Sequence, residues 1–339
     1  MRKNLTCKET DLPYQIRVST GSAILLGLLE GKVKAEPTTA YLMTYISGKC
    51  TANCGFCSQA RSSRSKAELL SRVTWPLFLT SIVLQKLENS TVEGRIMRIC
   101  IQALNYHDVF KHLVGLVKAI SQHSKAPVSV SCQPINSRNI RDLKEAGVER
   151  IGIAIDAVTE ELFNEVKGER AHGPYSWENQ FRQLSEAVKI FGKGKVSTHL
   201  IIGLGETEND AVSLIQRCVD MDVSPALFAF TPVRGTALET RTQPLIESYR
   251  KIQLARYLIV KGYGRSENMC FSDAGCLTDY GIEKESLISI VETGKPFLTS
   301  GCLNCNRPFY NEKPSGPMYN YPKNIRQEEI AEIKQQLGL

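Results

Sequence analysis

The feature that most restricts the fold is a repeated alternation of short apolar runs and helical segments along the 339-residue chain. The apolar runs are rich in β-branched and aromatic residues, which is typical of buried strands. Helical segments separate them, and one of these ends at Gly147, a residue type that often terminates helices. The expected strands cover residues 38–46, 95–103, 127–135, 149–158, 195–206, 226–236, 267–272 and 295–302.

Strict alternation of strands and helices predicts a parallel sheet with helices packed outside it. Eight such units over about 300 residues fit an α/β fold of the (β/α)8 TIM type, and a doubly wound open sheet is the alternative. We expect an N-terminal helical cap over residues 1–36, with a helix at 21–29, and the barrel over 37–305. The C-terminal end is cysteine-rich up to Cys305, and an extension follows it over 306–339, with a polar helix at 326–337.

Composition and charge narrow the class of protein. The chain is 42% hydrophobic, and no apolar run approaches the roughly 20 residues that cross a bilayer. The start, MRKNLTCKETDLPYQ, lacks the apolar region of a signal peptide, so we expect a cytoplasmic protein. The net charge of +7 indicates a lysine-rich surface or a face for an acidic partner. No basic run is interleaved with aromatic residues, which argues against nucleic-acid binding.

Three of the 11 cysteines lie close together as C-x3-C-x2-C, at Cys50, Cys54 and Cys57. They follow the first expected strand, and parallel barrels carry their chemistry in the loops after the strands. An odd cysteine count in such a chain favours metal binding and buried thiols over disulfides. Three thiolates on one short loop suit a [4Fe–4S] cluster with one iron left open. A zinc loop completed by a distant residue is the alternative.

With Phe56 before the last cysteine, this loop resembles the C-x3-C-x-aromatic-C motif of the radical S-adenosylmethionine (radical SAM) superfamily. The resemblance implies that Cys50, Cys54 and Cys57 hold a catalytic [4Fe–4S] cluster whose open iron binds SAM. One electron then cleaves the sulfonium to give methionine and a 5′-deoxyadenosyl radical, which takes hydrogen from an unactivated C–H bond. In such a protein the cofactor carries the chemistry, and the chain supplies orientation and excludes water.

Two further motifs support the resemblance. In the fifth expected strand, Ile201, Gly203 and Glu206 match the family's G-x-I-x-G-x-x-E, which packs near the adenine, with His199 in place of the first glycine. The sixth ends in TPVRGT, 231–236, which is similar to the P-x-x-G-T ending of the biotin synthase branch. The resemblance covers roughly residues 38–305.

Other cofactor contacts rest on position alone. After the second strand the family usually has a Gly-Gly-Glu turn, and this chain departs from it with QALN at 102–105. Asp156 closes the fourth strand, where the family often places a ribose contact. Arg170 follows that strand and is a candidate partner for the SAM carboxylate. Each has an alternative interpretation, as a solvated turn aspartate and a surface arginine.

Four later cysteines form a second set. A C-x5-C pair and a C-x2-C pair lie at or just after the last two expected strands, and all seven thiols are expected at one mouth of the barrel. We interpret the set as an auxiliary [4Fe–4S] cluster that donates sulfur, with four-thiolate zinc as the alternative. The residues are Cys270, Cys276, Cys302 and Cys305.

Two strand cysteines offer a competing site. Cys100 and Cys132 fall where biotin synthase keeps ligands of its sulfur-donating [2Fe–2S] cluster, and the third such position is Ser197. A buried strand cysteine is usually a small apolar residue. We favour that interpretation for Cys100, Cys132 and Cys218.

The sequence is most similar to the biotin-synthase-related branch, which includes the subunits of a two-component lipoyl synthase. The resemblance implies a sulfurtransferase that takes hydrogen from an octanoyl-lysine chain and inserts sulfur from the auxiliary cluster. Alternatives are sulfur insertion into dethiobiotin, another radical SAM reaction on a cofactor precursor, or a non-catalytic zinc-organised binding protein. Implied partners are an octanoylated lipoyl-carrier protein or a small-molecule precursor, a homologous radical SAM subunit, and a ferredoxin- or flavodoxin-type reductant, without nucleic acid or membrane.

Overall fold

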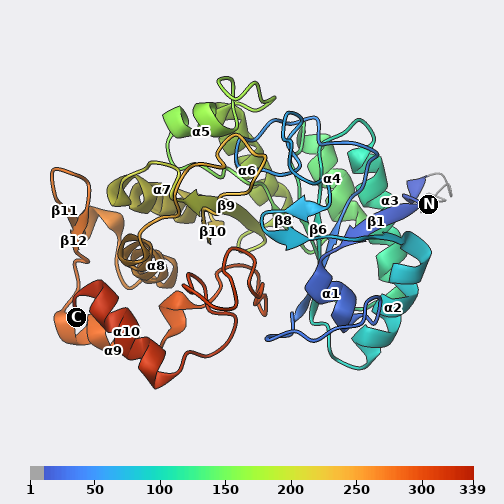
Figure 1. Cartoon of the computed structure of the whole chain (residues 1–339). Coiled ribbons are helices and arrows are strands. Elements are labelled where there is room, and N and C mark those ends of the chain that lie inside the picture. Colours follow the sequence, from blue (N-terminus) through green and yellow to red (C-terminus); the bar gives the residue numbers. More distant parts are fainter. Residues whose placement is uncertain (1–10) are drawn as a thin grey trace.

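The computed structural model describes residues 11–339, and Cys7 lies outside the described residues. Its centre is an eight-stranded sheet in the order β10-β9-β8-β7-β6-β2-β1-β5. The strands from β2 to β10 in this order pair in parallel, and helices cover their outer face (Figure 1). Their bounds are β2 Thr39–Met43, β6 Arg98–Gln102, β7 Val128–Ser131, β8 Arg150–Gly152, β9 Val196–Ile202 and β10 Val223–Ala229. The predicted α/β class with a parallel TIM-type sheet is confirmed.

The sheet gains its last two strands from an unexpected place. β1 (Gln15–Val18) pairs antiparallel with β2 and with β5 (Leu77–Leu79), so the N-terminal segment joins the sheet. The helix expected at 21–29 is the shorter α1 (Thr20–Leu25), with the Ser19 side chain accepting from the Ser22 N–H at its start.

The seventh and eighth expected strands are not part of this sheet, and that detail of the prediction is wrong. β11 (Cys270–Phe271) pairs instead with β12 (Leu277–Asp279) in a separate hairpin, on which Cys270 is exposed. Residues 295–297 form a 3-10 helix (η3, Lys295–Phe297), because Pro296 cannot donate to a strand ladder. The sheet therefore has open edges at β10 and β5.

Amphipathic helices cover the sheet as their periodicity predicts. In α3, for example, the buried residues Val109, Leu113, Leu116 and Ile120 recur at three- and four-residue intervals. The helix ending at Gly147 is confirmed, with that glycine at φ 108°. The helices are α2 Thr80–Val92, α3 Val109–His123, α4 Ser137–Ala146, α5 Glu160–Val166, α6 Trp177–Phe191, α7 Glu208–Asp220, α8 Ile246–Lys261, α9 Lys284–Glu292 and α10 Gln327–Leu337. The remaining short elements are β3 Leu69–Leu70, β4 Val73–Thr74 and η2 Ser266–Asn268.

The inner face of the sheet carries polar side chains, unlike the outer face. In β6, Ile99 and Ile101 are fully buried under the helices, while Arg98, Cys100 and Gln102 alternate with them and face inward. The interior is therefore suited to hold a site as well as an apolar core.

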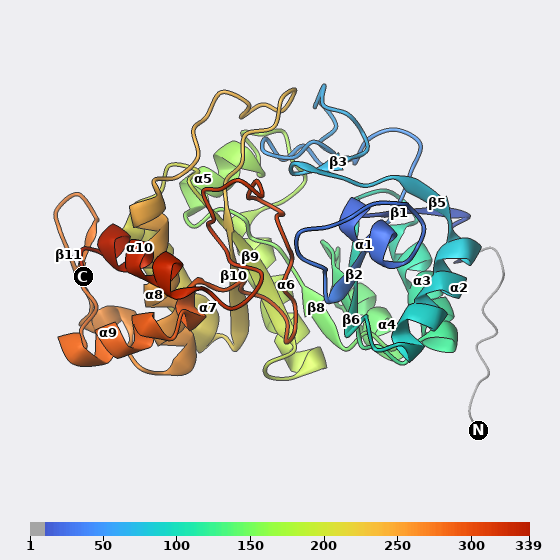
Figure 2. The same ribbon diagram turned by 60° about the horizontal axis from the view of Figure 1, so that its bottom comes forward.

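A C-terminal segment crosses the open side of the sheet (Figure 2, red). At one end, the Leu227 N–H of β10 donates to Ser300 Oγ over 2.8 Å. At the other, the Thr38 N–H beside β2 donates to Asn306 Oδ1 over 3.0 Å. Farther on, buried Arg250 of α8 donates to the Tyr319 carbonyl over 2.7 Å. Residues 300–306 thus link β10, at one edge of the sheet, to the residue before β2.

Within residues 11–339, no helix is both long enough and apolar enough to cross a membrane.

Candidate functional site

The three-cysteine loop follows β2 and is fixed by backbone contacts. The Gly55 N–H donates to the Val166 carbonyl at the end of α5 over 2.6 Å, and the Cys57 N–H donates to the Cys54 carbonyl over 3.0 Å. Lys49 Nζ ties the start of the loop to its end, since it donates to the carbonyls of Ser58 and Ser65 over 2.6 Å each. The thiols are therefore held on a preformed turn.

The TPVRGT segment after β10 supports this loop. The Arg64 N–H and the Ser63 hydroxyl both donate to the Gly235 carbonyl, over 2.8 and 3.1 Å. Gly235 has φ 85°, and a Cβ atom there would lie 2.5 Å from the Ser65 nitrogen. A glycine is therefore required at this position of the P-x-x-G-T motif.

Cys50, Cys54 and Cys57, the triad, line one cavity of about 200 Å³, the triad cavity, together with Phe56 and Asp156. Burial raises the pKa of all three thiols, that of Cys57 to about 12. Metal binding must displace these protons, as it does at any thiolate site. The Asn105 N–H in the QALN turn donates to Cys50 Sγ over 3.1 Å, the kind of contact that tunes a cluster ligand. The donor set and its backbone support fit an iron–sulfur cluster.

A buried ion pair lies beside the triad. Lys167 Nζ is 2.6 Å from Asp156 Oδ2, and the two side chains are 1% and 11% exposed. Lys167 also donates to the Ala154 carbonyl, and its charge opposes the effect of burial on the pKa of Cys54. Asp156 adopts φ 70°, a left-handed conformation that aspartate tolerates better than most residues. Such backbone strain is typical of functional positions.

The structure does not bring Arg170 to this cavity. Its side chain is 54% exposed, and it donates to the Glu161 carbonyl over 2.6 Å. Lys167 is the cationic side chain that lines the triad cavity. Nothing in the local sequence distinguishes Lys167 from other lysines, because its position depends on the fold.

Gly203 and Glu206 also lie outside the triad cavity. The Glu206 carboxylate accepts from the N–H groups of Gly203 and Leu204, over 2.5 and 2.9 Å, and so shapes the loop after β9. A Cβ on Gly203 would lie 2.7 Å from Pro244. Ile201 of the same motif does line the cavity. The motif therefore positions one wall of the cavity through this loop.

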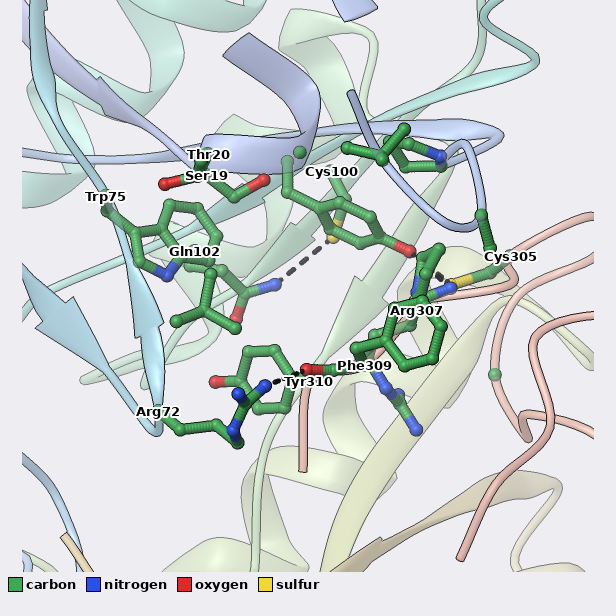
Figure 3. Close-up of a pocket in the computed structure, with 18 of the residues that line it drawn as sticks. Ser19, Thr20, Arg72, Trp75, Cys100, Gln102, Cys305, Arg307, Phe309 and Tyr310 are labelled. Atoms are coloured by element: carbon green, nitrogen blue, oxygen red, sulfur yellow. Dashed lines mark hydrogen bonds between the residues drawn. The ribbon is translucent and has the colours of Figure 1, made fainter. Parts of the chain in front are cut away.

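A second, larger cavity of about 440 Å³, the side cavity, lies on the inner side of the sheet (Figure 3). It adjoins residues 300–306, which we call the crossing segment. Cys100, Cys302 and Cys305 line it. Burial and the nearby Cys302 and Cys305 thiols raise the pKa of Cys100. Cys100 thus lies close to two other cysteines, Cys302 and Cys305, whereas we expected it to be only a small apolar residue of the core.

The expected four-cysteine set is divided in the structure. Cys270 and Cys276 are exposed on the β11–β12 hairpin, which lies at the left edge of both Figure 1 and Figure 2. Neither lines the cavity of Cys302 and Cys305. The seven thiols therefore do not converge on one mouth. Cys132 lines the triad cavity, and Cys218 is buried in the core as expected.

The two cavities share a wall made by Gln102, His199, Phe228 and Tyr310. The His199 and Phe228 rings lie 4.8 Å apart, and Arg307 lies over the Phe228 ring at 3.7 Å. Within residues 11–339, no three His, Cys, Asp or Glu side chains are already arranged around a single metal ion, the triad included.

We expect His199 to make the stability of the cluster-free chain depend on pH. Burial lowers its pKa from 6.5 to about 4, with Arg307 and Lys167 acting in the same direction and Asp156 against it. The unfolded chain therefore binds this proton more readily, and stability present above pH 6.5 is lost as the pH falls toward 4. At about 1.4 kcal/mol per pH unit, the loss approaches about 3 kcal/mol.

Chemical unfolding at several pH values checks this. His199→Gln should flatten the dependence between pH 6.5 and 4, whereas His107→Gln, at a side chain that is 95% exposed, should leave it unchanged. An unaltered slope in His199→Gln would show that this histidine is not the cause.

Comparison with known families identifies the class of protein. The family model "Radical SAM superfamily" matches residues 44–218, more than half of the chain, and this region contains the triad, Asp156 and Lys167. The chain therefore belongs to the radical SAM superfamily, whose members use a [4Fe–4S] cluster and SAM.

Curated relatives narrow the branch. The chain is 26% identical over 234 residues to the biotin synthase of Acinetobacter calcoaceticus, covering 66% of each chain. It is 23% identical over 209 residues to that of Persephonella marina, covering 58% of this chain and 55% of the relative. The chain thus spans about two thirds or less of these relatives, and it is related to biotin synthases.

Solved structures agree on the fold. A methylornithine synthase matches with a TM-score of 0.51 at 14% identity, over 65% of this chain and 62% of that one. The FeFe-hydrogenase maturase HydG from Carboxydothermus hydrogenoformans matches with a TM-score of 0.51 at 15% identity, over 88% and 76%.

Proposed function

We propose that this chain is a sulfur-inserting radical SAM enzyme that acts on an octanoyl-lysine chain. The observation that carries the proposal is the pair of adjoining cavities with a common wall, one lined by the triad and Cys132 and the other by Cys100, Cys302 and Cys305. Sulfur insertion requires a hydrogen-abstracting radical on one side of the substrate carbon and a sulfur source on the other. When bound, SAM and its [4Fe–4S] cluster supply the radical.

The chain's own residues position and shield these reactants. The backbone contacts of the cysteine loop would hold the cluster ligands in place. Lys167, which lines the triad cavity, would pair with the SAM carboxylate in the role that we expected of Arg170. The aromatic wall of Phe228 and Tyr310 excludes water between the cavities. His199, kept neutral by burial at physiological pH, places no positive charge beside a developing radical.

The side cavity suits an acyl chain. Its volume lies within the roughly 300–1,000 Å³ typical of small-molecule sites. Much of its lining is apolar, including Val33, Pro37, Trp75, Ala226 and Phe309. Lys32 and Lys34 are exposed at its edge, where they would attract an acidic carrier domain.

The relationship to biotin synthases supports a second candidate, sulfur insertion into dethiobiotin. The homologous subunit and the ferredoxin- or flavodoxin-type reductant remain part of the proposal.

A product assay separates the candidates. Anaerobically reconstituted protein, with SAM and reductant, should add sulfur to an octanoylated lipoyl-carrier peptide, seen as a mass increase of one or two sulfur atoms. Dethiobiotin under the same conditions should stay unchanged. Sulfur on dethiobiotin and none on the peptide would reject the octanoyl substrate, and no sulfur on either, with or without a homologous subunit, would reject sulfur insertion.

A further inference from the structure

Three neighbouring strands place a row of inward-facing side chains at one level of the side cavity. In the parallel register, Tyr41 of β2 is the partner of Cys100 of β6, and Cys100 is the partner of Ser129 of β7. Side chains in register on parallel strands point to the same face of the sheet. Cys100 therefore lies between Tyr41 and Ser129.

The crossing segment adds two thiols to this row. Cys305 Sγ is 3.2 Å from the Tyr41 hydroxyl, and Cys302 Sγ is 3.6 Å from the Ser129 hydroxyl. The Cys305 N–H donates to the Cys302 carbonyl over 3.0 Å, so a tight turn presents both thiols to the sheet. Since their partners flank Cys100, the three cysteines lie on neighbouring parts of the lining of one cavity.

Polar groups around the three sulfurs resemble the surroundings of a cluster ligand set. The Gln102 amide donates to Cys100 Sγ over 3.2 Å (Figure 3). Each of the three sulfurs therefore has a polar partner, since Tyr41 contacts Cys305 and Ser129 contacts Cys302. The Arg307 N–H in turn donates to the Tyr41 hydroxyl over 3.0 Å, which fixes that group beside Cys305. Hydrogen bonds to ligand sulfurs are one of the means by which proteins tune iron–sulfur centres.

We propose that Cys100, Cys302 and Cys305 bind the auxiliary [4Fe–4S] cluster, and that Cys270 and Cys276 do not. The proposal rests on the proposed function for the role of the cluster as sulfur donor, but not for the ligand set itself. Three thiolates leave one iron without a cysteine ligand, as in the triad, whereas structural zinc usually takes four protein ligands. Because one ligand comes from β6 and two from the crossing segment, cluster binding would also close the open side of the sheet.

Metal analysis of variants tests the ligand set without any activity assay. The background is the full chain with Cys50, Cys54 and Cys57 all changed to alanine, reconstituted anaerobically with iron and sulfide. We expect it to retain about four irons and four sulfides per chain, with the EPR signal of a reduced cubane cluster. Adding Cys100→Ala or Cys302→Ala should reduce both contents to near zero.

Two matched variants control for folding and for the alternative ligands. Adding Cys132→Ala, at a buried thiol that follows the neighbouring strand β7, should leave about four irons in place. Adding Cys270→Ala and Cys276→Ala together should do the same. Iron that persists in the Cys100→Ala variant, iron lost with Cys270 and Cys276, or zinc in place of iron would each overturn the proposal.

The ligand set and the proposed function can be rejected independently of each other. A wild-type chain whose second cluster depends on Cys100, but which adds no sulfur to the octanoylated peptide, would uphold the site and reject its role. Sulfur transfer that survives Cys100→Ala, with iron content unchanged, would reject the site and uphold the function.

Discussion

Replacing Cys54 by alanine is expected to abolish SAM cleavage, with a loss of several orders of magnitude in 5′-deoxyadenosine formation. Cys54 is one of only three thiols in the triad cavity loop, and the cluster that binds SAM has no substitute ligand within that loop. Cys50→Ala and Cys57→Ala should have the same effect. Chromatographic measurement of methionine and 5′-deoxyadenosine from reduced, reconstituted protein checks this.

The matched control is Cys276→Ala, which removes an exposed thiol from the β11–β12 hairpin. This variant should release both products at the wild-type rate. If Cys54→Ala retained substantial cleavage, the triad would not be the site at which SAM reacts.

Replacing Lys167 by methionine is expected to lower the free energy of unfolding of the cluster-free chain by about 3–5 kcal/mol. The change leaves the Asp156 carboxylate buried without the cation that now lies 2.6 Å from it. An uncompensated buried charge is among the most destabilising defects that one substitution creates. Guanidinium unfolding monitored by fluorescence measures the difference.

The double variant Lys167→Met with Asp156→Asn tests the cause. Asparagine has the same shape, tolerates the left-handed conformation at φ 70°, and carries no charge, so much of the lost stability should return. Equal destabilisation in the single and double variants would attribute the effect to lost packing around Lys167.

The sequence pattern predicts the first six strands and the helices between them, except the short α5, because each is marked locally. Apolar runs bounded by turns define buried strands, and helical periodicity with a glycine at 147 defines helix ends. The pattern places the sixth strand too late, at residue 226, because Pro225 suggests a break. The edge position of β10 accommodates that proline.

The end of the chain could not be predicted in the same way. Residues 267–272 and 295–302 have the composition of short strands, but each lacks partners in the sheet. The antiparallel strands β1 and β5 extend the sheet beyond β2. The crossing segment joins β10 to the residue before β2 on the side of the sheet that the helices do not cover. These arrangements depend on contacts between residues far apart in sequence, which local periodicity does not report.

The candidate site also has one part that is marked locally in the sequence and another that depends on contacts between distant residues. The triad could be predicted from the sequence because its three cysteines lie within eight residues of one loop. Lys167 and the group of Cys100, Cys302 and Cys305 are assembled only by the fold. One sequence signal for Cys100 did exist, since Arg98, Cys100 and Gln102 alternate with isoleucines in β6 and mark an inner face that is not purely apolar.

The most direct test of the central claim follows a hydrogen atom from the substrate. A lipoyl-carrier peptide with a fully deuterated octanoyl chain is incubated anaerobically with the reconstituted protein, SAM and reductant, and 5′-deoxyadenosine is examined by mass spectrometry. The account predicts 5′-deoxyadenosine that carries one deuterium, formed together with sulfur on the peptide. Abundant 5′-deoxyadenosine without deuterium would contradict it, because the octanoyl chain would then not lie beside the site of SAM cleavage.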